Sequence, residues 1–233
     1  METPKNDQII RVKTGSSNCY LVVNGLQTIL IDAGLKNNEQ KILDALHSIG
    51  LSPKDVKLII LTHTHYDHCG SLKALKNITN AKIVVHVAEA ECLEQGYCEI
   101  PRGTMWFSKL LSQVGRALGK RIGKYPSTTP DILIKDKFDL HDYGIDGYII
   151  PTPGHTKGSM SIIIGDRYAI VGDTLFNIFR NSVFPPFADD QETLLRSWKT
   201  LIDIGCEYYY PGHGDLFRKD RFKRIYEVKT ETC

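Results

Sequence analysis

The sequence predicts a mixed α/β fold in which two β-sheets lie between outer helices. Strand-like runs at residues 18–23 and 27–31 flank Asn24-Gly25, a dipeptide that favours a two-residue hairpin turn. Further along the chain, β-type apolar runs alternate with segments whose apolar residues recur at helical spacing. Hairpins combined with strand–helix units indicate two sheets with helices on their outer sides.

Apolar spacing predicts the other elements in order. The first helix covers residues 38–49 and is ended by Gly50 and Pro53. A short helix begins at Asp67 or His68 and continues through Leu75. Further helices are expected at 88–95, 190–203 and 216–228. Strands are expected at 57–61, 82–87, 131–134, 147–151, 160–164, 167–171 and 207–210.

Length and composition agree with one enzyme domain that spans residues 1–233. The formal net charge of +2 gives no general electrostatic signal for nucleic acid. No apolar run approaches the roughly 18 residues of a membrane span, and the N-terminal METPKNDQIIRVKTG lacks the apolar core of a signal peptide. The cytoplasm is therefore the expected compartment. The six cysteines form no C-x-x-C pair and are read as reduced.

The most informative motif follows the strand-like run at 56–61. It reads His63-Thr64-His65-Tyr66-Asp67-His68. Histidine and carboxylate are the donors that zinc and related ions prefer, and a strand followed by a short loop directs alternate side chains into a shared cavity. An HxHxDH string is expected by chance in roughly one such chain in a thousand. The motif therefore indicates a metal site rather than a polar loop at a helix start.

Three later motifs each place one donor directly after a β-type run. The donors are His155 in PGHTKGS, Asp173 in GDT and His213 in GHG. A single His or Asp in a glycine-bounded turn is usually a cap or a hydrogen-bonded loop residue. The repeated position after a strand is where α/β folds collect active-site residues, so we expect all three to join the first motif.

The chain contains five motifs that resemble, in order, the five signature motifs of the metallo-β-lactamase-fold hydrolase superfamily. They are IDAG (Ile31–Gly34), HTHYDH, PGHTKGS, GDT and GHG. The resemblance runs from about residue 18 to residue 214. It implies a four-layer αββα sandwich, in agreement with the two sheets and outer helices expected from periodicity. The superfamily supports many reactions, so the motifs indicate the fold more closely than the substrate.

The candidate ligands divide into two groups. The first consists of three imidazoles that leave a coordination position open, as catalytic zinc sites require: His63, His65 and His155. The second consists of Asp67, His68 and His213. The resemblance implies that Asp173 bridges two divalent ions, with zinc expected and iron or manganese as alternatives. Asp67 is also the expected catalytic group, because it can orient the attacking hydroxide and hand a proton to the leaving group.

Five other titratable residues are interpreted separately. Asp32 in IDAG either supports the ligand loops through hydrogen bonds or forms a plain turn. His86 has no carboxylate at metal-site spacing and is read as a buried or supporting residue. His47 and His141 are expected at the surface. Cys69 is expected to fill space as a small packing residue.

The segment 102–124 carries six basic residues and no acidic one. Its apolar residues follow helical spacing over about 104–118, which predicts an amphipathic helix. This helix either packs on the body with a solvated basic face or forms a lid or homodimer contact beside the substrate. The candidate pocket residues in and after it are Trp106, Phe107, Phe176, Phe179 and Arg180. Core packing of the rings is an equal alternative.

The sequence thus predicts a binuclear hydrolase in which a metal-bridging hydroxide attacks a small thioester, lactone, ester or amide. Only 20 residues follow His213, fewer than the glutathione-binding extension of hydroxyacylglutathione hydrolases. Phe176 stands where similar lactonases carry a pocket tyrosine. The alternatives are a mono-iron persulfide dioxygenase of the same fold, which uses only the first ligand group, and a phosphodiesterase. Metal identity and oxygen consumption separate the dioxygenase, and a substrate panel separates the phosphodiesterase.

Overall fold

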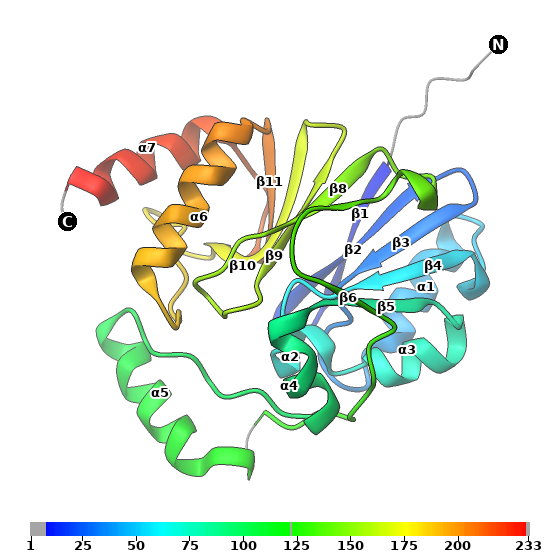
Figure 1. Cartoon of the computed structure of the whole chain (residues 1–233), viewed down its shortest axis with the longest axis horizontal. Helices are drawn as coiled ribbons and strands as arrows, with labels where there is room; N and C mark the ends of the chain where they lie inside the picture. The colour runs from blue at the N-terminus through cyan, green and yellow to red at the C-terminus, as the bar shows by residue number, and fades with distance from the viewer. Residues whose placement is uncertain (1–7, 122, 232–233) are drawn as a thin grey trace.

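Two six-stranded sheets lie face to face, with helices on their outer sides (Figure 1). The structure is a computed structural model that describes residues 8–121 and 123–231; the side chain of Lys120 is also not described. The signal-peptide reading of residues 1–7 and the reduced state of Cys233 lie outside the described residues. Within the described ranges, none of the helices is long and apolar enough to cross a bilayer. The predicted αββα architecture is confirmed.

The first sheet comprises β1 to β6 in chain order. Its strands are β1 (Gln8–Thr14), β2 (Ser17–Asn24), β3 (Gln27–Ile31), β4 (Val56–Ile60), β5 (Lys82–His86) and β6 (Ile132–Ile134). The predicted β2–β3 hairpin is confirmed, whereas β3 to β6 pair in parallel. Strand β1 was not predicted. It is an edge strand in which Arg11 and Lys13 interrupt the apolar pattern.

The second sheet has the order β12-β11-β10-β9-β8-β7. Its strands are β7 (Phe138–Asp139), β8 (Gly147–Pro151), β9 (Met160–Ile164), β10 (Tyr168–Asn177), β11 (Tyr208–Gly214) and β12 (Phe217–Arg218). Strand β10 is longer than the predicted 167–171 and includes the GDT motif. Its parallel pairing with β11 shifts register twice, between Ile170 and Gly172 and between Gly172 and Phe176. The second of these intervals contains Asp173, so the pairing is irregular where this carboxylate lies.

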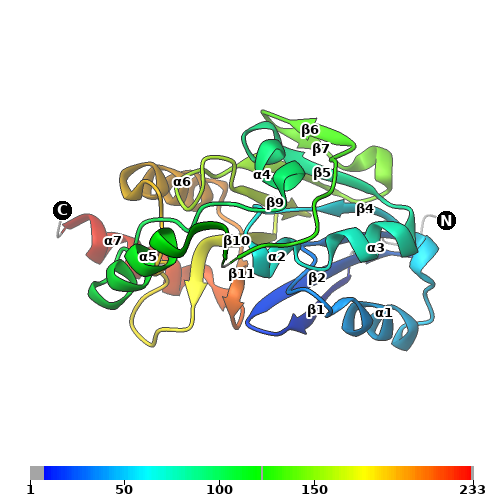
Figure 2. The ribbon, with the colours of Figure 1, turned by 90° about the horizontal axis from the view of Figure 1, so that it is seen from below.

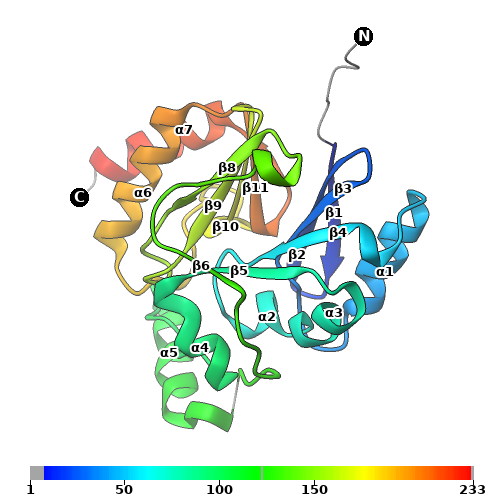
Figure 3. The same ribbon diagram turned by 45° about the vertical axis from the view of Figure 1, so that its right-hand side comes forward.

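The helices cover the outer face of each sheet (Figure 3). The first sheet is covered by α1 (Glu39–Ser48), α3 (Leu72–Thr79) and α4 (Ala90–Gln95), and the second by α6 (Gln191–Ile204) and α7 (Lys219–Glu231). The helix expected from Asp67 through Leu75 is divided at Gly70 and Ser71 into α2 (Tyr66–Cys69) and α3. The described residues also form four 3₁₀ turns: η1 (Pro53–Asp55), η2 (Val87–Glu89), η3 (Gly119–Arg121) and η4 (His141–Tyr143).

The two sheets share a buried apolar core that includes Ile29, Ile60, Ile162 and Ile170. Full burial of such a side chain contributes about 1.5–3 kcal/mol to stability. Polar contacts also join the sheets: the hydroxyl of Tyr20 on β2 donates to the Pro211 carbonyl on β11 at 2.7 Å. This packing fixes the end of β4 opposite β10 and β11, where the predicted donors lie.

Helix α5 (Trp106–Leu118) lies on the same side of the molecule as α6 and α7, away from α1 and α3 (Figure 2). Small residues form its buried face: Ser108, Ser112 and Gly115. Most of its large apolar side chains are exposed, including Leu110, Leu111 and Val114, whereas Phe107 is half-buried. The helix thus contacts the body through its small residues, because serine and glycine let it lie close to Ile100 and Pro101.

Candidate metal centre

The loop after β4 and the short helix α2 position four of the predicted donors. His63 and His65 lie in the loop, and His65 has an extended backbone (φ −71°, ψ 152°) just before α2 begins. Asp67 and His68 follow in the single turn of α2. The backbone carbonyl of Asp67 accepts a 2.5 Å hydrogen bond from the Ser17 hydroxyl on β2. The strand-to-helix turn therefore holds these donors at one place.

The other three donors come from the second sheet. His155 lies in the loop between β8 and β9, Asp173 on β10 and His213 on β11. Gly212 precedes His213 because a Cβ at this position would lie 2.3 Å from Asp173 Oδ1 and 2.7 Å from His68 Cε1. Only glycine leaves room for the carboxylate and the imidazole.

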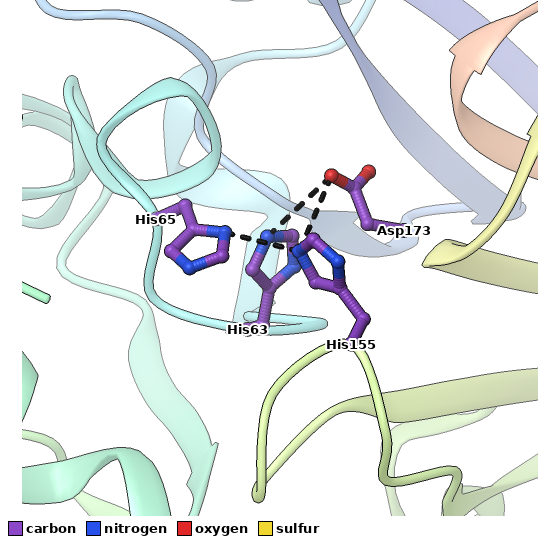
Figure 4. A group of neighbouring side chains, drawn as sticks. All are labelled: His63, His65, His155 and Asp173. Carbon is purple, nitrogen blue, oxygen red and sulfur yellow. Dashed lines mark hydrogen bonds and ion pairs between the residues drawn. The ribbon is translucent and has the colours of Figure 1, made fainter. Parts of the chain in front are cut away.

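The first group contains His63, His65, His155 and Asp173, and its donor atoms lie within 4.8 Å of one another. Figure 4 shows the three imidazoles converging in front of the Asp173 carboxylate. His155 Nε2 is 3.0 Å from His65 Nδ1. Asp173 Oδ2 is 3.5 Å from His155 Nε2 and 3.8 Å from His63 Nε2.

The second group contains Asp67, His68 and His213. His213 Nε2 is 3.3 Å from Asp67 Oδ2 and 3.3 Å from His68 Nε2. The other oxygen of Asp173, Oδ1, is 3.3 Å from His68 Nε2 and 3.5 Å from His213 Nε2. Asp173 thus turns one oxygen towards each group.

Buried polar atoms without hydrogen-bond partners show that this constellation fits divalent ions. His63 Nε2 and Asp173 Oδ1 are both buried without such a partner, and His65 turns its Nδ1 towards the same group. An unpaired buried donor or acceptor costs about 1–3 kcal/mol. The arrangement of imidazole and carboxylate donors provides the neutral and anionic ligands that zinc takes, and a bound ion would satisfy the inward-facing atoms.

Hydrogen bonds behind the ligands orient most of the rings. His68 Nδ1 is 2.8 Å from Asp32 Oδ2, His155 Nδ1 is 2.8 Å from the Phe187 carbonyl, and His213 Nδ1 is 2.8 Å from the Ser16 carbonyl. Each contact leaves Nε2 directed to the centre. Asp32 also accepts hydrogen bonds from the Thr62 amide and hydroxyl, each at 2.8 Å. The backbone of Asp32 is left-handed (φ 61°). The hydrogen bonds of its carboxylate to His68 and Thr62 are the contacts that a supporting role requires.

The electrostatic environment differs between the two groups. Burial lowers the pKa of His63 well below its usual value and that of His65 and His155 to about 4, so these rings are neutral near pH 7. Burial opposes protonation of His213 as well, but Asp173 and Asp67 outweigh it and raise its pKa to about 9. The second group therefore holds protons that a metal ion must displace.

His68 behaves like His213. Burial opposes its charge, yet Asp173, Asp32 and Asp67 raise the pKa of His68 well above its usual value. Burial by itself would raise the pKa of Asp67, but neighbouring His68 and His213 keep the pKa of this carboxyl below its usual value. Asp67 is therefore ionised at neutral pH.

The remaining predicted residues belong to neither ligand group. His86 is half-buried, and its Nδ1 accepts a 3.1 Å hydrogen bond from the Ala88 amide at the start of η2. His47 is exposed on α1, and His141 is exposed beside Asp139. Cys69 is buried, and its thiol donates to the carbonyl of His65 at 3.1 Å. These positions agree with the supporting, surface and packing interpretations.

Glu89 is a buried residue at this centre that the sequence analysis missed. One carboxylate oxygen accepts hydrogen bonds from the Thr64 amide at 3.1 Å and from its hydroxyl at 2.5 Å. The other accepts from the Gly158 amide at 3.1 Å. Glu89 therefore ties the loop of His63 and His65 to the loop of His155. Glu91 and Glu94 follow in the same acidic stretch, so no local signal distinguishes Glu89.

Replacing Glu89 with Gln is expected to destabilise the protein by about 1–3 kcal/mol, because an amide NH₂ would face a backbone N–H donor in place of an acceptor oxygen. Denaturant unfolding of the metal-free protein measures this effect. Glu91→Gln, on the same segment, is the control and should leave the free energy of unfolding within about 0.5 kcal/mol of the parent. Equal stability of the two variants would contradict the tethering role.

A cavity of about 440 Å³ opens onto both ligand groups. Beside the ligands, its wall is largely apolar: Cys98, Ile100, Pro101, Leu111, Val114, Phe176, Pro186 and Phe187. The Phe176 ring is stacked on the His213 ring with centroids 4.4 Å apart. Helix α5 contributes Leu111 and Val114, so the 102–124 segment forms part of the cavity wall.

Four of the five predicted pocket residues lie outside this wall. Trp106 is 84% exposed at the start of α5, and the Phe107 ring contacts those of Trp106 and Phe179 instead. Arg180 lines a separate cavity with Arg221 and Arg224. The pocket interpretation of Trp106, Phe107, Phe179 and Arg180 is therefore corrected. The turn of α5 that faces the ligands begins about one turn later, at Leu111.

Comparison with known proteins agrees with this geometry. A model of the metallo-beta-lactamase superfamily matches residues 12–213. A probable metallo-hydrolase of Methanocaldococcus jannaschii is 30% identical over 206 residues, which cover 86% of this chain and 89% of that protein. An acyl-coenzyme A thioesterase of Gallus gallus is 27% identical over 224 residues, covering 90% and 76% respectively.

Solved structures show the same fold. A metallo-beta-lactamase superfamily protein from Sulfolobus tokodaii superposes with a TM-score of 0.69 at 24% identity, over 97% of this chain and 87% of that one. The B3 metallo-beta-lactamase BLEG-1 superposes with a TM-score of 0.74 at 20% identity, over 96% and 100%. The sequence match over most of the chain, the αββα sheets and the clustered histidines and aspartates agree with one another, and the protein belongs to the metallo-beta-lactamase superfamily.

Proposed function

We propose that this protein is a binuclear zinc hydrolase that cleaves an apolar acyl thioester or a related lactone or ester. The observation that carries the proposal is Asp173, whose two oxygens face different ligand groups. The second group, Asp67, His68 and His213, is complete, which supports two ions over one. When bound, the ions would supply hydroxide near neutral pH and polarise the carbonyl under attack.

The chain's own residues perform the remaining tasks. Asp67 is ionised and lines the cavity, so it can take a proton from the attacking water and pass it to the leaving thiolate or alkoxide. The neutral rings of His63, His65 and His155 are available as ligands without first losing a proton. Asp32 and Glu89 hold the loops in position.

The cavity wall supports an apolar acyl group as the part of the substrate beside the ligands. A volume of about 440 Å³ lies within the range of small-molecule sites. Ile100, Leu111, Val114 and Phe187 provide an apolar wall with no charged side chain among them. The similarity to an acyl-coenzyme A thioesterase agrees with this substrate class.

A substrate panel tests the proposal. Zinc-loaded protein should hydrolyse acyl thioesters or lactones faster than β-lactams or phosphodiesters, and removal of the metal by a chelator should abolish turnover until zinc is restored. Turnover of phosphodiesters alone would overturn the substrate class. Hydrolysis that persists without metal would overturn the mechanism.

The role of α5 is tested with a matched pair of variants. Leu111→Ala should raise the Michaelis constant for an acyl thioester several-fold, because Leu111 lines the cavity and buries against the substrate. Leu110→Ala removes a side chain of similar exposure from the same helix that is not part of the wall and should have no such effect. Metal content should be unchanged in both. Identical Michaelis constants for the two variants would remove α5 from the substrate site.

A further inference from the structure

Two thiols meet at the edge of the cavity. Cys92 lies on α4, and Cys98 lies in the segment that follows it. Gly96 ends α4 in a left-handed conformation (φ 65°), and the Tyr97 amide donates back to the Cys92 carbonyl at 3.1 Å. This reversal of the chain brings Cys98 Sγ to 3.1 Å from Cys92 Sγ.

These thiols differ from the other cysteines in the described part of the chain. Cys92 and Cys98 are half-buried, whereas Cys19, Cys69 and Cys206 are buried. Cys98 also lines the cavity beside the metal ligands, whereas Cys92 is not part of that wall. A small oxidant can therefore reach the pair more readily than the three buried thiols.

The segment that carries Cys98 also supports α5. The Ser112 hydroxyl donates to the Pro101 carbonyl at 2.6 Å, and Arg116 pairs with Glu99 at 2.7 Å. At Gly115 the helix lies directly against Ile100. Residues 99–101 thus connect Cys98 to α5, and a displacement of Cys98 would shift the part of the helix that carries Leu111 and Val114.

We propose that Cys92 and Cys98 form a reversible disulfide in the presence of a peroxide and that this bond reshapes the substrate cavity through residues 98–118. Formation of the bond is independent of the function proposed above. Its effect on turnover rests on that function. The device would adjust substrate access while leaving the ligands unaltered.

The chemistry needs only the two thiols and hydrogen peroxide. The Cys92 thiolate attacks one peroxide oxygen, which breaks the O–O bond and gives a Cys92 sulfenic acid and hydroxide, protonated to water. Cys98 sulfur then attacks Cys92 sulfur, the S–S bond forms, and the leaving hydroxide takes up the Cys98 proton as a second water. Two electrons pass from the thiols to the peroxide. The hydrogen bond between the two thiols lowers the pKa of Cys92, which favours Cys92 as the attacking group.

The geometry needs little change. The sulfurs must approach by about 1 Å to reach bonding distance. A dithiol such as dithiothreitol would reverse the reaction by thiol–disulfide exchange.

The test exposes the full-length, metal-loaded protein to a small excess of hydrogen peroxide and maps its cysteines by mass spectrometry after alkylation. A peptide pair joined through Cys92 and Cys98, absent after dithiothreitol, is expected. Backbone hydrogen exchange in residues 98–118 should change on oxidation and return on reduction. The Michaelis constant for an acyl thioester should change several-fold and reversibly, with metal content constant.

Two variants control the experiment. Cys92→Ser should keep the basal activity, because Cys92 does not line the cavity, and should lose the exchange and kinetic responses to peroxide. Cys233→Ala should retain both responses. Absence of the Cys92–Cys98 link, or a link that leaves hydrogen exchange at 98–118 unchanged, overturns the inference. Because these readouts need no substrate, they distinguish its failure from failure of the proposed hydrolase activity.

Discussion

Asp173→Ala is expected to weaken metal binding at both ligand groups and to lower turnover by more than about 100-fold. Each Asp173 oxygen faces one group, and the shared negative charge would offset the repulsion between two bound dications. Removal of the carboxylate leaves His63, His155, His68 and His213 without their common anionic neighbour. Metal analysis of the purified variant, together with turnover of an acyl thioester, measures both effects.

His86→Ala is the control for this experiment. It removes an imidazole that caps η2 and belongs to neither ligand group, so the metal content should match that of the parent even if the variant is less stable. If Asp173→Ala retained two tightly bound ions and full turnover, the bridging role would be wrong.

The two ions are expected to bind with different pH dependence. His63, His65 and His155 are neutral near pH 7, because burial lowers their pKa values, so the first ion should bind there with little proton release. His68 and His213 have raised pKa values, about 9 for His213, and each must lose a proton to bind the second ion. The apparent affinity for the second ion should rise up to about tenfold per pH unit for each displaced proton between pH 7 and 9.

Calorimetric titration of the metal-free protein with zinc in two buffers of different ionisation enthalpy counts the protons released at each step. His213→Ala should retain the first, weakly pH-dependent event and lose most of the second. Equal proton release in the two steps would contradict the assignment of protonated rings to the second group.

The clustering of the candidate donors could be predicted from the sequence, because these residues stand in short motifs at strand ends. HTHYDH needs only a strand followed by a turn to bring His63, His65 and His68 together. His155, Asp173 and His213 come from distant segments of the chain. Their meeting with the first motif was predicted from the order of the five motifs, because no single turn contains all of these residues. The hairpin and the outer helices followed from local periodicity in the same way.

The features that were missed depend on packing between distant segments. Glu89 is set apart from Glu91 and Glu94 only by its contacts with Thr64 and Gly158. The apolar spacing of α5 predicted a helix correctly, but its small-residue face turned out to be the packed one. Which apolar side chains line the cavity was then decided by how α5 meets residues 98–101. The spacing of apolar residues shows which side chains share a face of a helix. It does not show which part of the protein each face contacts.

The proposed binuclear hydrolase is tested by the metal content of protein purified without added metal, measured together with its reaction. Two zinc ions per chain are expected, with hydrolysis of an acyl thioester or lactone and no oxygen consumption. One iron per chain, with oxygen consumed during turnover of a persulfide, would contradict the proposal.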